Sequence, residues 1–313
     1  MQRLVDERGS VSVVVALLMV PVMGLAAVSL DVAGLWAKRQ QLQIGADAAA
    51  LAIAQDCGQG NCGSPAATAQ SMAQLNVNDG AATGTVLNSV TVSSGTVTVQ
   101  TSGVRQHLFA PILGVNQTTV TARATAAWGS PSSGTAVLPL AFSWCEFLAQ
   151  TGGGLPSGDT TRIIKLTKSS STTCTGPSHN VVPGGFGWLV VNSGTCQTLG
   201  TVGGKLDSNP GDSPPSSCSS ADFAALQNRT ALLPIFDFAG GSGNNAWYRL
   251  YAYAAFTITG YYFAGQYGWN PAGCSGNDRC LKGYFVRFVD LSEAFTYSTS
   301  APQLGAGVIR LTD

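Results

Sequence analysis

The chain has 313 residues, equal numbers of acidic and basic side chains, and only 10% charged residues, against about 25% in an average soluble protein. It has no basic excess and, apart from the pair Lys38 and Arg39, no cluster of Lys and Arg, which argues against a nucleic-acid partner. Abundant Gly, Ser and Thr, with valine alternating with threonine in several places, are typical of an exported β protein rather than a cytosolic enzyme.

The first predicted element is a helix that opens with an uncharged run, residues 10–30. At about 1.5 Å per residue this run reaches roughly 30 Å, the thickness of a bilayer's hydrocarbon core. A cleaved secretory signal is the alternative. However, the run exceeds the usual apolar core of about 7 to 15 residues, and no clear A-x-A cleavage site follows it. We therefore expect an uncleaved membrane anchor, with the lipid bilayer as its first partner.

The helix is expected to continue to about residue 56 as an amphipathic, Ala-rich segment. Asp31 follows the apolar run directly, and we expect it at the membrane interface, because a carboxylate immersed in lipid is costly. Small residues in membrane helices allow close packing of backbones. On this ground the candidates for helix packing in the membrane are Gly24, Ala27 and Gly34.

A small α+β unit is expected over residues 57–128. Pro65 suits the first turn of a short helix, which the Asn-Asp-Gly sequence at 78–80 ends. Alternation of Val with Thr or Ser around residues 93–95 indicates a hairpin. A short helical or irregular crossing at 107–113 and a third strand at 117–127 follow. Residues 129–134, GSPSSG, are a linker by composition.

The remaining region, 135–313, is expected to be β-rich and extracytoplasmic. Its predicted strands are rich in β-branched and aromatic residues, and one helix is expected from Ser220 to Leu232 with Ser220 as N-cap. The stretch from Trp247 to Trp269 is apolar on both faces, which favours a central, covered strand over a platform for sugar rings. The predicted fold class is α+β: residues 1–56 form a cytoplasmic tip, a transmembrane helix and its extension, followed by the two regions above.

Eight cysteines, an even number, all lie beyond the apolar run and none forms C-x-x-C. We expect disulfides rather than a zinc site, because neither histidine has the required spacing. The local pairs are Cys57 with Cys62 and Cys274 with Cys280. The other four can pair in three ways, of which we favour Cys145 with Cys174 and Cys196 with Cys218. Disulfides persist in oxidising compartments, so residues 31–313 should face outward and residues 1–9 the cytoplasm.

No catalytic constellation is found in the sequence. Any triad would need His107 or His179, and His179 could form a dyad with Cys174 only if that cysteine were not in a disulfide. No G-x-S-x-G sequence occurs. We expect no catalytic, cofactor-binding or metal-binding residues, no cofactor, no nucleic acid and no small-molecule substrate.

The N-terminal residues resemble a known family. They show an Arg-Gly start, an apolar span, Asp31 and Gly34 after it, a Leu-Gln pair at 42–43, and Ala-Asp-Ala-Ala-Ala-Leu-Ala at 46–52. This combination resembles the TadE/TadG-like proteins of Flp (tight adherence, Tad) pilus assembly. Segments up to residue 127, and others such as LPLAFSWCEF and GGFGWL, are also similar to these proteins.

The resemblance implies a single-pass protein of the bacterial cytoplasmic membrane that acts as a structural or accessory part of a pilus or secretion machine. Its implied partners are pilus or secretion-platform proteins, including pilin-like subunits. Prepilin-type members have Glu five residues after the cleavage-site Gly. Here Val14 follows Gly9 at that distance, so a permanently anchored TadG-like role fits better. The alternative function is a membrane-anchored surface adhesin or glycan-binding module. An exported hydrolase ranks last.

Overall fold

The computed structural model describes residues 8–263, 265–269, 272–287 and 294–312. Most of the segment expected in the cytoplasm, residues 1–9, therefore lies outside the described residues. The chain divides into two compact units: unit 1 is Met1–Ala127 with Arg310–Asp313, and unit 2 is Trp128–Ile309. The last residues, expected in the β-rich region, thus belong to unit 1, where the Thr312 N–H donates to the Thr125 carbonyl at 2.9 Å.

Unit 1 is built along α1 (Arg8–Gly58), a helix that continues unbroken through Pro21. Its C-terminal half buries one stripe of side chains at helical spacing, namely Leu42, Ala46, Ala49, Ala50, Ile53 and Ala54. Its N-terminal half exposes nearly all of its apolar side chains. The two halves of one helix therefore have different surroundings.

The C-terminal half of α1 is covered by α2 (Pro65–Leu75) and a sheet of β1 (Thr83–Val86), β2 (Thr96–Gln106) and β3 (Gln117–Ala136). The strands are antiparallel, and β2 pairs with β3 from Thr96↔Ala127 to Gln106↔Gln117. Alternate β2 residues, Val97, Val99 and Thr101, are buried, as expected when one face of a sheet packs on a helix. The 3-10 turns η1 (Val92–Ser94) and η2 (Ala110–Leu113) lie in the β1–β2 and β2–β3 connections.

The segment expected as a linker, residues 129–134, lies inside β3. Ser133 is paired on both sides, with Thr201 of β9 (Thr198–Thr201) and Thr296 of β15 (Phe295–Ser298). Gly134 is in close contact with Phe295, where a Cβ would have no room. A Ser/Gly-rich composition therefore does not mark a linker here, because pairing partners far along the chain hold this segment as a strand.

Unit 2 is a curled sheet with the strand order β5-β14-β12-β11-β4-β8. A bridge between Leu166 and Phe186 joins the two ends of this path, so the six strands close into a ring. Its strands are β4 (Leu140–Ser143), β5 (Arg162–Lys165), β8 (Phe186–Trp188), β11 (Thr230–Gly240), β12 (Trp247–Tyr262) and β14 (Cys280–Val286). The smaller strands are β6 (Thr173–Thr175), β7 (Val181–Pro183), β10 (Lys205–Asp207) and β13 (Gly268–Trp269). The last strand, β16 (Val308–Leu311), pairs with β3 and extends into unit 1.

The core of unit 2 is aromatic. The Phe142 ring lies 5.0 to 6.3 Å from the rings of Phe186, Phe256 and Phe285, which come from three other strands. The central strand is β12, bonded to β11 and β14 along its length and covered on both faces. An irregularity opposite β11 leaves Tyr251 unpaired, so the faces to which alternate residues point change at this place.

Two helices of unit 2 differ from expectation. α3 (Trp144–Thr151) lies in the region expected to be β-rich, and Ser143 caps it by accepting the Cys145 N–H at 3.0 Å. α4 (Ser220–Ala224) is much shorter than the helix expected to reach Leu232. Its N-cap is Ser219, which forms a capping box with Asp222. The residues from Thr230 onward form β11 instead, because they pair with the central strand β12.

The structure contains four disulfides: Cys57–Cys62, Cys145–Cys174, Cys196–Cys218 and Cys274–Cys280. These are the four pairs expected from the sequence. Each joins residues within one unit, so they cross-link loops inside the units.

Phe142→Ala should destabilise unit 2 by about 3 to 5 kcal/mol, because it opens a cavity among three rings. The measurement is urea unfolding of the full-length chain in detergent micelles, followed by tryptophan fluorescence. Leu199→Ala, at an exposed position of the same unit, should change the free energy of unfolding by less than about 0.5 kcal/mol. Equal effects of the two substitutions would contradict the assigned core.

Candidate functional site along the first helix

The N-terminal half of the first helix has an exposed apolar surface, and its C-terminal half packs against other elements. Among the described residues, α1 is the one helix long and apolar enough to cross a membrane. Residues 12–30 are exposed except for the half-buried Ala27. Large apolar side chains exposed in this number mark a surface that needs an apolar partner. The candidate site is the part of α1 where this exposed half meets the half that is covered by α2 and the sheet of unit 1.

Strand β2 follows α1 in the opposite direction along the transition. Thr101 Oγ1 donates to the Leu42 carbonyl at 2.8 Å. Two residues on, Gly103 lies against the Lys38 side chain, and two further on, Arg105 lies against Gly34. Each step of four helix residues covers about 6 Å and each step of two strand residues about 6.6 Å, so the two elements stay in register.

This register brings the end of the β2–β3 hairpin to Asp31. The carboxylate accepts the backbone N–H of Leu108 at 2.7 Å, of Phe109 at 3.0 Å and of Ala110 at 2.8 Å. These N–H groups begin the η2 turn, where such donors have no partner within the turn. Asp31 is 8% exposed. It therefore acts as the cap of a turn that lies 77 to 79 residues away in the chain.

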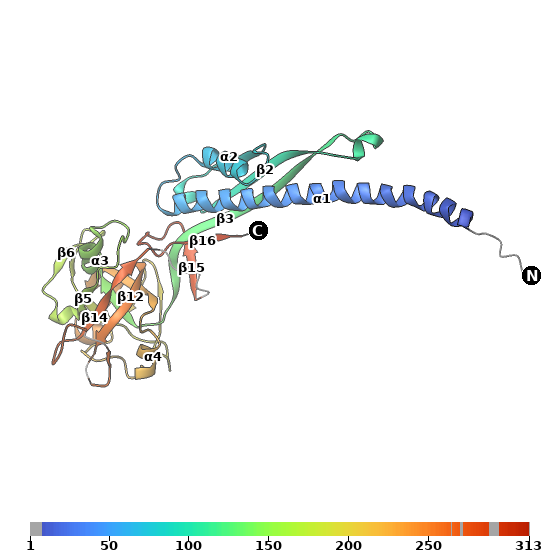
Figure 1. Cartoon of the computed structure of the whole chain (residues 1–313). Coiled ribbons are helices and arrows are strands. Elements are labelled where there is room, and N and C mark those ends of the chain that lie inside the picture. The colour runs from blue at the N-terminus through green and yellow to red at the C-terminus, as the bar shows by residue number, and fades with distance from the viewer. Residues whose placement is uncertain (1–7, 264, 270–271, 288–293, 313) are drawn as a thin grey trace, which may run out of the picture. The chain divides into compact units, whose positions relative to one another are not determined.

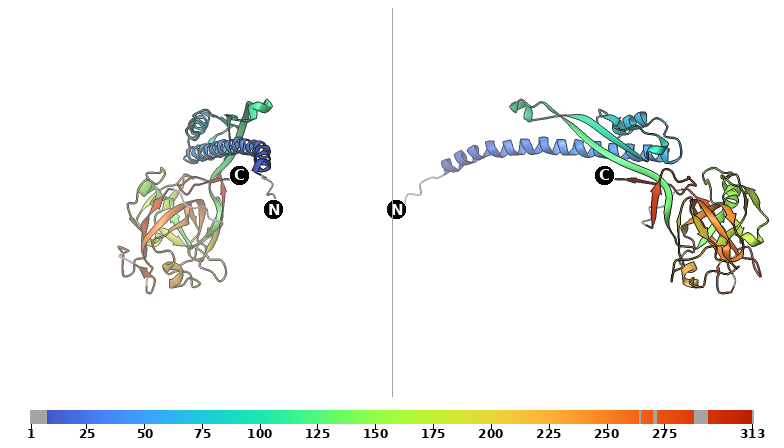
Figure 2. Two further views of the ribbon diagram at one scale, coloured as in Figure 1. Left: turned by 45° about the vertical axis from the view of Figure 1, so that its right-hand side comes forward. Right: turned by 180° about the vertical axis from the view of Figure 1, so that it is seen from behind.

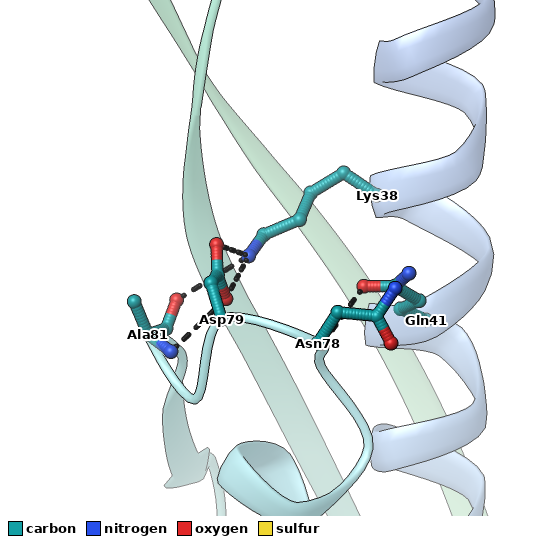
Figure 3. A network of polar contacts seen from close by, with 5 residues as sticks. All are labelled: Lys38, Gln41, Asn78, Asp79 and Ala81. Atoms are coloured by element: carbon teal, nitrogen blue, oxygen red, sulfur yellow. Dashed lines mark hydrogen bonds and ion pairs between the residues drawn. The ribbon is translucent and has the colours of Figure 1, made fainter.

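A second charged side chain on the same stripe, Lys38, binds the loop after α2 (Figure 3). Lys38 is 5% exposed, and its Nζ donates to both carboxylate oxygens of Asp79 at 2.8 Å. The Ala81 N–H also donates to Asp79 at 3.0 Å, and the Asn78 N–H donates to the Gln41 side chain at 3.3 Å. The hydrogen bonds from Lys38 and Ala81 hold the pKa of Asp79 below its ordinary value of 3.8.

The three small residues expected to pack helices in the membrane have different surroundings. Gly24 is exposed with no other part of the chain near it, and Ala27 is half-buried. Gly34 lies against Arg105, where an added Cβ would come within 2.9 Å of a guanidinium nitrogen. Gly24 is thus on the open surface and Ala27 is partly covered, whereas the close contact at Gly34 lies within unit 1. Packing of these residues against another membrane helix remains a prediction.

The residues considered for catalysis have other roles. Cys174 is bonded to Cys145, so its sulfur cannot act as a nucleophile. His107 Nε2 lies 2.8 Å from Thr118 Oγ1 across the hairpin, and His179 lies in a turn with φ 63°. In the described part of the chain, no three His, Cys, Asp or Glu side chains gather as a metal site would require.

The sequence reading missed the partners of Asp31 and the role of Lys38. A signal was present, because residues 31, 38, 42, 49 and 53 recur at helical spacing. The stripe that is apolar at Leu42, Ala49 and Ile53 therefore begins with two charges. A charge in line with buried positions indicates a polar partner across the interface. The sequence gives no means of finding that partner.

These features define a class: proteins in which one long helix exposes an apolar half and carries a small α+β unit on its other half. Residues 9–56 match the family model of Tad, described as Flp pilus-assembly TadE/G-like. The match covers nearly the whole of α1, including Asp31 and Lys38. No curated protein and no solved structure matched the chain.

Because the pKa of Asp79 is lowered in the folded state, its contribution to stability is present above pH 3.8 and is lost as the pH falls through the lower, folded-state value. Asp79→Asn should remove this acid dependence from the loop after α2 and cost about 1 kcal/mol or less near neutral pH. The measurement is hydrogen exchange of residues 65–86 in the full-length chain between pH 3 and 7, corrected for the intrinsic pH dependence of exchange.

Asp212→Asn is the matched control, because it breaks an ion pair with the exposed Lys168 in unit 2. It should leave exchange in residues 65–86 unchanged. An acid dependence that survives Asp79→Asn would show that another group governs this loop.

Proposed function

We propose that the chain is a membrane-anchored structural or accessory component of Tad/Flp-type pilus assembly or secretion, without catalytic activity. The observation that carries the proposal is the family match over residues 9–56. It coincides with a helix whose N-terminal half is apolar and exposed. Anchoring by this helix leaves both folded units on one side of the bilayer.

The proposed site is the bacterial cytoplasmic membrane, crossed once, with the N-terminus inside. All eight cysteines lie after the span and are in disulfides. Disulfides form and persist outside the cytoplasm, which supports an extracytoplasmic position for residues 31–313.

The proposed partners are pilus or secretion-platform proteins, with pilin-like subunits among them. A helix whose small residues face lipid can pack closely against another membrane helix. Gly24, which is exposed, and Ala27, which is half-buried, lie three residues apart on the N-terminal half of α1 and would form such a face. Unit 2 would then contact partners outside the membrane.

A second candidate is a surface adhesin or glycan-binding module. Its support is an open hollow of about 520 Å³ in unit 2, lined by Tyr261, Tyr262 and Trp269 among others. Aromatic faces stack on sugar rings. The other tryptophan considered for this role, Trp247, packs instead against Phe238 and below Lys205.

In-cell crosslinking of the full-length chain, followed by membrane extraction, pull-down and identification of what is captured, tests the proposal. Pilus-platform or pilin proteins should be recovered. Their yield should fall with Ala27→Leu, because the larger side chain prevents close approach of a second helix. Ala26→Leu, at the exposed neighbouring position, should leave the yield unchanged.

Capture of cell-wall glycan in place of pilus proteins, with loss of that glycan on Trp269→Ala, would replace the assembly role by adhesion. Recovery of neither class of partner would contradict both candidates.

A further inference from the structure

The connection between β2 and β3, residues 107–116, which we call the hairpin tip, is an apolar surface that the chain leaves uncovered. Ile112 is 86% exposed, Leu113 79% and Leu108 68%, and Phe109 and Val115 are also exposed. No charged side chain occurs from Leu108 to Asn116. Five large exposed apolar side chains within ten residues indicate a surface that contacts an apolar partner.

The position of the hairpin tip relative to the helix is fixed by Asp31. Its carboxylate holds the N–H groups of Leu108, Phe109 and Ala110, and Asp31 is the first residue after the apolar run 10–30. Because β2 runs opposite to α1, the hairpin tip points toward the N-terminal, apolar half of the helix (Figures 1 and 2). The hairpin tip therefore lies at the level where the apolar half of α1 begins.

The residues of α1 around this level suit a membrane interface. Trp36 is exposed and lies five residues beyond Asp31, about 7.5 Å farther along the helix axis. Tryptophan is enriched at the level of the lipid headgroups. The basic side chain of Arg39, which is exposed, follows three residues later. This places Asp31 and the hairpin tip at the boundary between headgroups and acyl chains.

The backbone N–H groups of the hairpin tip are largely hydrogen-bonded, as an apolar environment requires. Besides the three N–H groups held by Asp31, the N–H of Gly114 donates to Pro111 at 3.0 Å and that of Val115 to Ala110 at 3.2 Å. The N–H of His107 donates to Asn116 at 3.0 Å, and that of Ile112 to Phe109 at 3.2 Å. Pro111 has no N–H to satisfy. Unpaired backbone groups are what normally keep irregular segments out of lipid.

We propose that the hairpin tip inserts Leu108, Ile112 and Leu113 into the outer leaflet of the bilayer that α1 crosses. It thereby forms a second membrane contact that holds unit 1 against the membrane surface. The partner of this apolar surface is lipid, because the hairpin tip lies at the same position along the helix axis as the start of the exposed apolar half of α1. The proposal rests on the membrane anchoring put forward above, not on the role in pilus assembly.

The test uses the full-length chain in nanodiscs of phosphatidylethanolamine and phosphatidylglycerol, with the photocrosslinking residue p-benzoylphenylalanine replacing Ile112. The matched control replaces Leu75, which is 74% exposed at the end of α2. Lipid adducts should form at position 112 and exceed those at 75 by about tenfold or more, since burial of one aliphatic side chain shifts a partition by that factor. Equal yields at the two positions would overturn the proposal.

The same two positions are then examined in cells, where other proteins are present. A lipid adduct at 112 supports the proposal, and a predominant protein adduct at 112 overturns it in favour of a protein docking surface. Extraction of the membranes with alkaline carbonate distinguishes the membrane anchor from the hairpin contact. Release of the chain would refute the membrane anchor and the hairpin contact together, whereas retention without a lipid adduct would refute only the hairpin contact. Failure to recover pilus proteins would leave the hairpin contact intact.

Discussion

The carboxylate of Asp31 joins α1 to the β2–β3 hairpin, two segments that lie far apart in the sequence. Three backbone N–H groups of the hairpin converge on it, and hydrogen bonds to an ionised acceptor are about twice as strong as neutral ones. Because Asp31 directly follows the apolar run, the hairpin cannot slide along the helix without losing them. The same side chain thus caps the η2 turn and fixes the position of that turn along the axis of α1.

Two further contacts keep the same register. Lys38, one step farther along the stripe, holds Asp79 and with it the loop after α2, and Thr101 holds the Leu42 carbonyl. Beyond Leu42 the stripe is apolar and buried. Polar contacts therefore occupy the part of α1 nearest the exposed apolar run, and apolar packing occupies the part beneath the sheet. In this order, one helix carries both an exposed apolar half and a packed half.

Local patterns in the sequence were sufficient for much of the fold. The length of the apolar run predicts α1, Pro65 predicts the start of α2, and close cysteine spacing predicts two of the four disulfides. The errors arise where distant residues decide the local structure. Residues 129–134 have a loop composition but are held as strand by β9 and β15. The helix expected to reach Leu232 ends early because β11 pairs with β12.

The site was less accessible to sequence reasoning than the fold. The sequence predicts a membrane-interface position for Asp31 but not its hydrogen-bond partners, which lie 77 to 79 residues away. Packing of β2 along α1 brings them together. The Ser-x-x-Glu pattern at 143–146 is a local signal for the start of α3. The apolar and aromatic residues around it favour a strand instead. Such contacts become predictable once the antiparallel register of β2 against α1 is known.

Hydrogen exchange at the amides of Leu108, Phe109 and Ala110 in Asp31→Ala tests whether Asp31 positions the hairpin, with Asp47→Ala as control. Asp47 is also a carboxylate on α1, and it accepts a hydrogen bond from Gln43 on the same helix. We expect the three amides to be protected in the natural chain and in Asp47→Ala, and to exchange freely in Asp31→Ala. Protection that survives Asp31→Ala would show that other contacts, and not Asp31, position the hairpin.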